Sequence, residues 1–190
     1  MKLFKKVLAA ALAGVLALSV LTGCGSGSGT VDYTSQVVKE LSNVFAEDGI
    51  TVTEGDAAMK TKLKQFMSKV LDSDVSFDGV TDIIEAITED EKLAAEIKKM
   101  FPTAVLDDST KPLYNIGMAQ IEQSINDSNI KRYAQEMVDN SEELNYPEEI
   151  AGDDFDEGLE LTVAVTTVTI NNQEYLVGLF SRQVYTLAEP

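Results

Sequence analysis

The sequence predicts an α+β domain in which a helical bundle precedes a long C-terminal antiparallel β-hairpin. Three observations lead to this fold class. Apolar residues recur at helical spacing through residues 30–141, and the composition then shifts after residue 158 to segments rich in Val, Thr, Tyr and Leu. Asn171-Asn172 divides that second part in two, and Asn tolerates the positive φ that a two-residue hairpin turn needs.

The chain begins with a basic stretch that is followed by an apolar run. Met1–Lys6 holds three lysines and no acid, and residues 7–22 are apolar apart from Ser19 and Thr22. This run is shorter than the roughly 20 apolar residues that a membrane span needs. The combination is typical of a secretory signal peptide, so we expect residues 1–23 to be removed on export.

The apolar run ends in Leu21-Thr22-Gly23-Cys24. Residues 1–24 resemble those of bacterial lipoproteins, whose signal peptides end in Leu, a small residue, Gly or Ala, and Cys. The resemblance implies acylation of the Cys24 thiol with chains such as palmitate, cleavage before Cys24 and an anchor on the extracytoplasmic face of the cell membrane. Each buried methylene contributes about 0.8 kcal/mol, so two or more chains anchor stably. The alternative is an unmodified cysteine in a secreted protein.

Charge and length limit the kind of protein that the chain can form after residues 1–23 are removed. Loss of residues 1–23 removes three lysines and takes the net charge from −17 to −20. Such acidity argues against nucleic acid, whose phosphates require cations. GSGSG follows Cys24 directly, so residues 24–29 form the lipidated cysteine and a flexible tether. Residues 30–190 have the length of one domain with a real core.

Six stripes of apolar residues predict the helices of the bundle. Each stripe repeats at three- and four-residue intervals, the spacing of one helix face. The lysines of the second stripe are expected on its solvated face. Between the first two stripes apolar residues alternate with threonines, so residues 50–53 are a candidate third strand. The stripes lie within residues 37–45, 59–71, 83–87, 93–101, 113–125 and 130–138.

The sequence also predicts the register of the hairpin. The expected pairs are Ile170 with Gln173, Val168 with Tyr175, Val165 with Gly178, Val163 with Phe180 and Leu159 with Val184. One face is then apolar and is broken mainly by Arg182, and we expect it to pack on the helices. The other face should be partly exposed to water. The hairpin edge, with Tyr175 and Tyr185, is a candidate protein-contact surface unless helices of the same chain cover it.

The residues that the chain lacks exclude several classes of enzyme. There is no histidine, and the one cysteine is the expected lipidation site, so histidine-dependent serine or cysteine nucleophiles cannot be built. No Gly-rich phosphate loop is present. Paired carboxylates remain and would allow a carboxylate-dependent cell-wall hydrolase, but the sequence selects no pair among 32 acidic residues. We therefore assign no catalytic residue and favour a protein that is not an enzyme.

The stretch DSDVSFDGVTDIIE, residues 72–85, is a candidate calcium loop. Its oxygen-bearing side chains occupy the ligand positions of an EF-hand loop, which it resembles, and Gly79 occupies the position of the sharp turn. Phe77 and Thr81 depart from the EF-hand pattern, and there is no second loop. The alternative is a turn that starts a helix with Asp78 as its N-cap. The candidate ligands are Asp74, Ser76, Asp78, Asp82 and Glu85.

These observations favour a non-catalytic, lipid-anchored cell-envelope protein with a protein-binding or structural role. Its contact with the membrane would be the anchor on Cys24, and its partner would be another envelope or secreted protein. Two alternatives stay open. One is a calcium-stabilised binding module that uses the 74–85 loop, and the other is the carboxylate-dependent hydrolase. Apart from calcium, no cofactor is expected.

Overall fold

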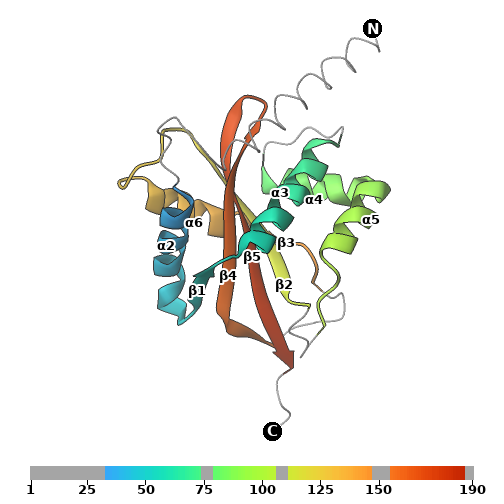
Figure 1. Ribbon diagram of the computed structural model, residues 1–190, viewed down its shortest axis with the longest axis horizontal. Helices are drawn as coiled ribbons and strands as arrows, with labels where there is room; N and C mark the ends of the chain where they lie inside the picture. The colour runs from blue at the N-terminus through green and yellow to red at the C-terminus, as the bar shows by residue number, and fades with distance from the viewer. Residues whose placement is uncertain (1–32, 74–78, 106–110, 147–154, 187–190) are drawn as a thin grey trace.

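A five-stranded mixed sheet runs through the middle of the molecule (Figure 1). The computed structural model describes residues 33–73, 79–105, 111–146 and 155–186, with side chains for 160–183 in the last of these ranges. The strands are β1 (Thr51–Glu54), β2 (Leu113–Gln120), β3 (Ser141–Glu143), β4 (Phe155–Ile170) and β5 (Gln173–Thr186). They lie in the order β1-β4-β5-β2-β3, with β1 parallel to β4 and the other neighbours antiparallel.

Helices cover both faces of this sheet (Figure 1). The described helices are α2 (Thr34–Phe45), the short 3-10 helix η1 (Ala46–Asp48), α3 (Ala57–Leu71), α4 (Val80–Glu89), α5 (Glu91–Met100) and α6 (Ile130–Asp139). The face under α3, α4 and α5 has one apolar core, built around Phe66, Ile83 and Leu179. The face under α2 and α6 has a second core, built around Leu41 and Tyr133.

This architecture shows that the predicted six-helix bundle is wrong. The segment expected to form a helix from about Pro112 forms β2 instead, and β2 pairs with β5 along its whole length. Because helices cover both faces of β2, most of its side chains are buried and show no polar alternation. Periodicity alone cannot distinguish such a strand from a helix. Two residues of the expected stripe, Ile121 and Ile125, lie in the connection to α6.

The C-terminal hairpin is present, but it forms the centre of the sheet. Asn171 and Asn172 have φ values of 50° and 67° and make its turn. The four predicted pairs nearest the turn are confirmed. The fifth is wrong, because the register shifts between Glu157 and Leu161 and places Glu157 opposite Val184. The alternation of apolar residues carries no signal for such a bulge.

The hairpin face that was expected to be partly wet is covered by α3, α4 and α5. Val177 and Leu179 are fully buried, and Tyr175 is 6% exposed. The hairpin therefore offers no exposed edge at Tyr175, and the side chain of Tyr185 lies outside the described residues. Within the described chain the outer strands are the short β1 and β3, and β1 corresponds to the candidate strand at residues 50–53.

Helix α6 lies close against the sheet at two glycines. Gly117 of β2 and Gly178 of β5 are direct partners in the ladder. A Cβ atom on Gly117 would lie 2.1 Å from the carbonyl oxygen of Met137, and one on Gly178 would lie 2.5 Å from the Met137 Cε methyl. The absence of side chains at both positions lets the last turn of α6 rest directly on the strands.

Replacement of each glycine by alanine should have unequal effects. Gly117→Ala meets backbone, which cannot move without displacing α6, so we expect a loss of about 3 kcal/mol in the free energy of unfolding. Gly178→Ala meets the flexible end of a methionine and should cost about 1 kcal/mol. Thermal unfolding followed by circular dichroism measures both, at about 2–4 °C per kcal/mol. Equal losses would contradict the close seating of α6.

One polar side chain among the described residues is buried, that of Asn145, which is 6% exposed. Its Oδ1 accepts a hydrogen bond from the backbone N–H of Tyr114 at 2.7 Å. Its Nδ2 donates to the carbonyl oxygens of Pro102 at 2.8 Å and Pro112 at 2.9 Å. Asn145 therefore fastens the segment that follows α5 to the first residues of β2.

Loss of this amide should destabilise the fold. Asn145→Ala leaves the Tyr114 N–H and two carbonyl oxygens without that partner, so we expect a loss of about 1–3 kcal/mol in the free energy of unfolding. Asn145→Asp keeps the acceptor but turns a carboxylate toward two carbonyl oxygens, and it should be no more stable than the alanine variant at neutral pH. Urea unfolding would measure both. A midpoint unchanged by Asn145→Ala would refute this role.

Candidate functional site

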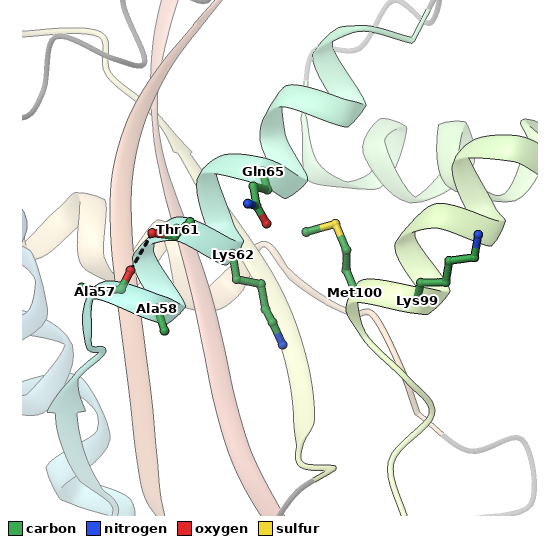
Figure 2. Close-up of a pocket in the computed structure, with 7 residues that line it drawn as sticks. All are labelled: Ala57, Ala58, Thr61, Lys62, Gln65, Lys99 and Met100. Carbon is green, nitrogen blue, oxygen red and sulfur yellow. Dashed lines mark hydrogen bonds between the residues drawn. The ribbon is translucent and has the colours of Figure 1, made fainter.

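A groove of about 600 Å³ lies between α3 and α5 on one side of the molecule (Figure 2). We call it the lysine groove. Lys62 extends from α3 into the space between the helices, and Met100 reaches toward Gln65 from α5 (Figure 2). The lining residues are Ala57, Ala58, Thr61, Lys62, Gln65, Lys99 and Met100. Most of them are exposed, so the groove is accessible to a macromolecule.

Local sequence places these side chains on the outer faces of the two helices. Asp56 caps α3 by accepting the backbone N–H of Met59 at 2.8 Å. The buried stripe of α3 then points toward the sheet, which leaves Lys62 on its flank. An ion pair between Lys69 and Glu96 joins α3 to α5, and it lowers the pKa of Glu96 chiefly through the hydrogen bond from Lys69.

Two aromatic rings hold the ammonium group of Lys62. Its Nζ lies 4.6 Å from the ring centroid of Tyr114 and 5.2 Å from that of Phe101. It also donates to the Tyr114 hydroxyl at 3.3 Å, and the two rings meet edge to face at 5.0 Å. Each cation–π contact contributes about 0.5–2 kcal/mol, depending on exposure. Lys62 is therefore a positioned cation rather than a freely moving one.

The groove is a basic region on an acidic protein. Helix α3 carries four lysines and no acid, and α5 carries three lysines and two acids, whereas the whole chain has a net charge of −17. Among the described residues, no ion pair joins Lys62, Lys64 or Lys99 to a carboxylate. The sequence indicated a solvated lysine face on α3, but it gave no sign that α5 would add to it.

A second cavity, of about 180 Å³, lies against the other face of the sheet, at the end of α2. We call it the arginine pocket. Its walls include the Phe45 and Phe180 rings, which meet edge to face at 6.4 Å between centroids. The described lining residues are Phe45, Asn115, Val138, Ser141, Tyr146, Leu161, Phe180 and Arg182. A guanidinium group therefore lies among aromatic, aliphatic and neutral polar side chains.

Burial controls the electrostatics of the arginine pocket. It lowers the pKa of Arg182, and the charges of Tyr146 and Asp48 partly oppose this effect. Burial likewise raises the pKa of Tyr146, as does the charge of Glu143, whereas Arg182 and a hydrogen bond with Asn115 act in the opposite direction. The sequence had marked Arg182 as the break in an apolar hairpin face. It gave no signal for Asn115 and Tyr146, which come from distant segments.

The candidate calcium ligands are only partly described. Asp74, Ser76 and Asp78 lie outside the described residues. Asp82 is half-buried and Glu85 is exposed, both on α4. The N-cap of α4 is Gly79 rather than the alternative that the sequence suggested, Asp78. Because glycine has no side chain, α4 has no side-chain capping bond. Within the described residues, no group of three or more acidic or cysteine side chains is placed to hold a metal ion.

Among the residues that the structure describes, no two carboxylates are brought together in either cavity. No described acidic residue lines the lysine groove or the arginine pocket. The pair that a carboxylate-dependent hydrolase needs is therefore not assembled there. No helix in the described ranges combines the length and apolar character needed to cross a membrane, and Cys24 precedes those ranges.

Comparisons with protein-family models, with curated proteins and with solved structures found no match for this chain. The features of the chain that bear on function are therefore the two cavities and the N-terminal motif.

Proposed function

We propose that the chain is a non-catalytic, lipid-anchored protein of the cell envelope that binds another envelope or secreted protein through the lysine groove. The observation that carries this proposal is the cation of Lys62, which lines an open groove and contacts the rings of Phe101 and Tyr114. The partner would present acidic side chains to it.

The N-terminal motif supports the anchoring part of the proposal. Leu21-Thr22-Gly23-Cys24 ends a basic and apolar leader. Nine residues lead from Cys24 to Tyr33, the first described residue, and a chain of that length reaches at most about 30 Å. The folded domain would thus stay close to the membrane surface and remain free to turn its groove toward a partner.

The chemistry of the groove supports the binding part. Because the Tyr114 and Phe101 rings already restrict Lys62, a partner carboxylate would meet a positioned ammonium group and cause little further loss of side-chain entropy. Lys99 also lines the groove and adds a second cation, and Ala57, Ala58 and Met100 contribute apolar lining. Complementary charge of this kind sets specificity and association rate more than affinity.

The anchor can be tested by fractionation. Cys24→Ala removes the thiol that would be acylated, so we expect the protein to move from the membrane fraction to the aqueous phase of a detergent partition. Ser26→Ala, in the tether, is the matched control and should stay with the membrane. Retention of Cys24→Ala in the membrane fraction, with its leader removed, would exclude the lipid anchor.

The groove can be tested by capture in native membranes. We expect a photo-crosslinking residue at Gln65 to trap a partner, and the double variant Lys62→Gln, Lys99→Gln to reduce that yield at least tenfold. The double variant Lys39→Gln, Lys131→Gln, at exposed lysines of α2 and α6 on the opposite face of the sheet, is the control of equal charge change. Raising the salt from 0.1 to 1 M shortens the Debye length from about 10 to 3 Å and should also reduce capture. Recovery of the uncrosslinked chain alone would contradict this function.

A further inference from the structure

The arginine pocket has a chemistry different from that of the lysine groove. It is smaller, and the sheet separates it from the groove, because its walls come from α2, α6 and the sheet face that these helices cover. Arg182 projects into it from β5, where its ladder partners are Leu113 of β2 and Leu161 of β4. A cation is thus fixed on a strand in the interior of the sheet, next to the buried Phe180.

We propose that the arginine pocket binds a carboxylate that carries a short apolar group, supplied either as a free monocarboxylic acid or as the C-terminal residue of a peptide. This inference does not rest on the proposed role of the lysine groove.

The polar side of the pocket fits a carboxylate. The planar guanidinium group matches the two oxygens of a carboxylate better than a point charge does. Asn115, Ser141 and Tyr146 add neutral amide and hydroxyl groups around it, and no described acidic side chain lines the pocket to repel an anion. Asp48 and Glu143 lie outside the described lining, but their charges act on Arg182 and Tyr146 respectively. A ligand carboxylate would therefore add to the interactions that Arg182 already makes.

The apolar side of the pocket limits the size of the ligand. Phe45, Val138, Leu161 and Phe180 form a wall without hydrogen-bonding side chains, which favours an aliphatic group over a second charge. A volume of about 180 Å³ equals about six water molecules at about 30 Å³ each. Butyrate has about that number of non-hydrogen atoms, so a short-chain acid or one small C-terminal side chain would fill the pocket.

The test is a thermal-shift and calorimetric titration of the purified full chain with butyrate, inorganic phosphate, and a peptide ending in valine with a free or an amidated C-terminus. We expect saturable binding of butyrate or the free-acid peptide, with a rise in Tm of about 5–10 °C at 100 times the Kd. Binding of the free-acid peptide but not of butyrate identifies the C-terminal residue of a peptide as the source of the carboxylate. Phosphate binding as tightly as both, or no saturable binding of either carboxylate, would overturn the proposal.

Variants tie the binding to the pocket. Arg182→Gln should weaken carboxylate binding at least 30-fold, whereas Arg132→Gln, at an exposed arginine of α6, should change it less than twofold. If Arg182→Gln does not fold, Val138→Phe provides the second test, because the added ring would occupy the pocket from α6. If the variant that folds binds the carboxylate with unchanged affinity, the ligand binds elsewhere and the assignment is refuted.

Discussion

The seating of α6 on Gly117 and Gly178 is the constraint on which both cavities depend. Met137 can place its carbonyl oxygen against β2 only because Gly117 has no side chain. The helix then ends at Asp139, and the chain enters β3, where Ser141 pairs with Gly117 itself. This one contact therefore sets the position of Val138 and Ser141 in the arginine pocket, and it fixes the start of the segment that leads to Asn145.

The same segment connects the two faces of the sheet. Tyr146 belongs to the arginine pocket, and its neighbour Asn145 holds the backbone of Pro102 and Tyr114. Tyr114 and Phe101, next to Pro102, are the rings that position Lys62. A short run of chain after β3 thus supports a small pocket on one side and a larger, more open groove on the other. The pocket and the groove suit different ligands, but the same segment after β3 positions residues of both.

Sequence patterns predicted local features of this fold better than its architecture. Asn171-Asn172 and the nearby register followed from turn chemistry and alternation, and Arg182 was visible as a charged residue in an apolar series. Strand β2 was not predicted, because burial on both faces removes the alternation that distinguishes a strand. The partners of Lys62 and Arg182 were also not predictable, since Tyr114 and Tyr146 reach them from segments far along the chain. Such proximity is a property of the tertiary fold.

Helix α2 separates the start of the described chain from the arginine pocket. Its first residue, Thr34, is near the start of the described chain, and its last residue, Phe45, lines the arginine pocket. Its 12 residues span about 18 Å. In a protein held by Cys24, the pocket would lie a full helix length beyond the point at which the chain leaves for the membrane. Because the segment back to Cys24 could reach farther than this, α2 would set the distance of the pocket from the attachment point but not the direction in which the pocket faces.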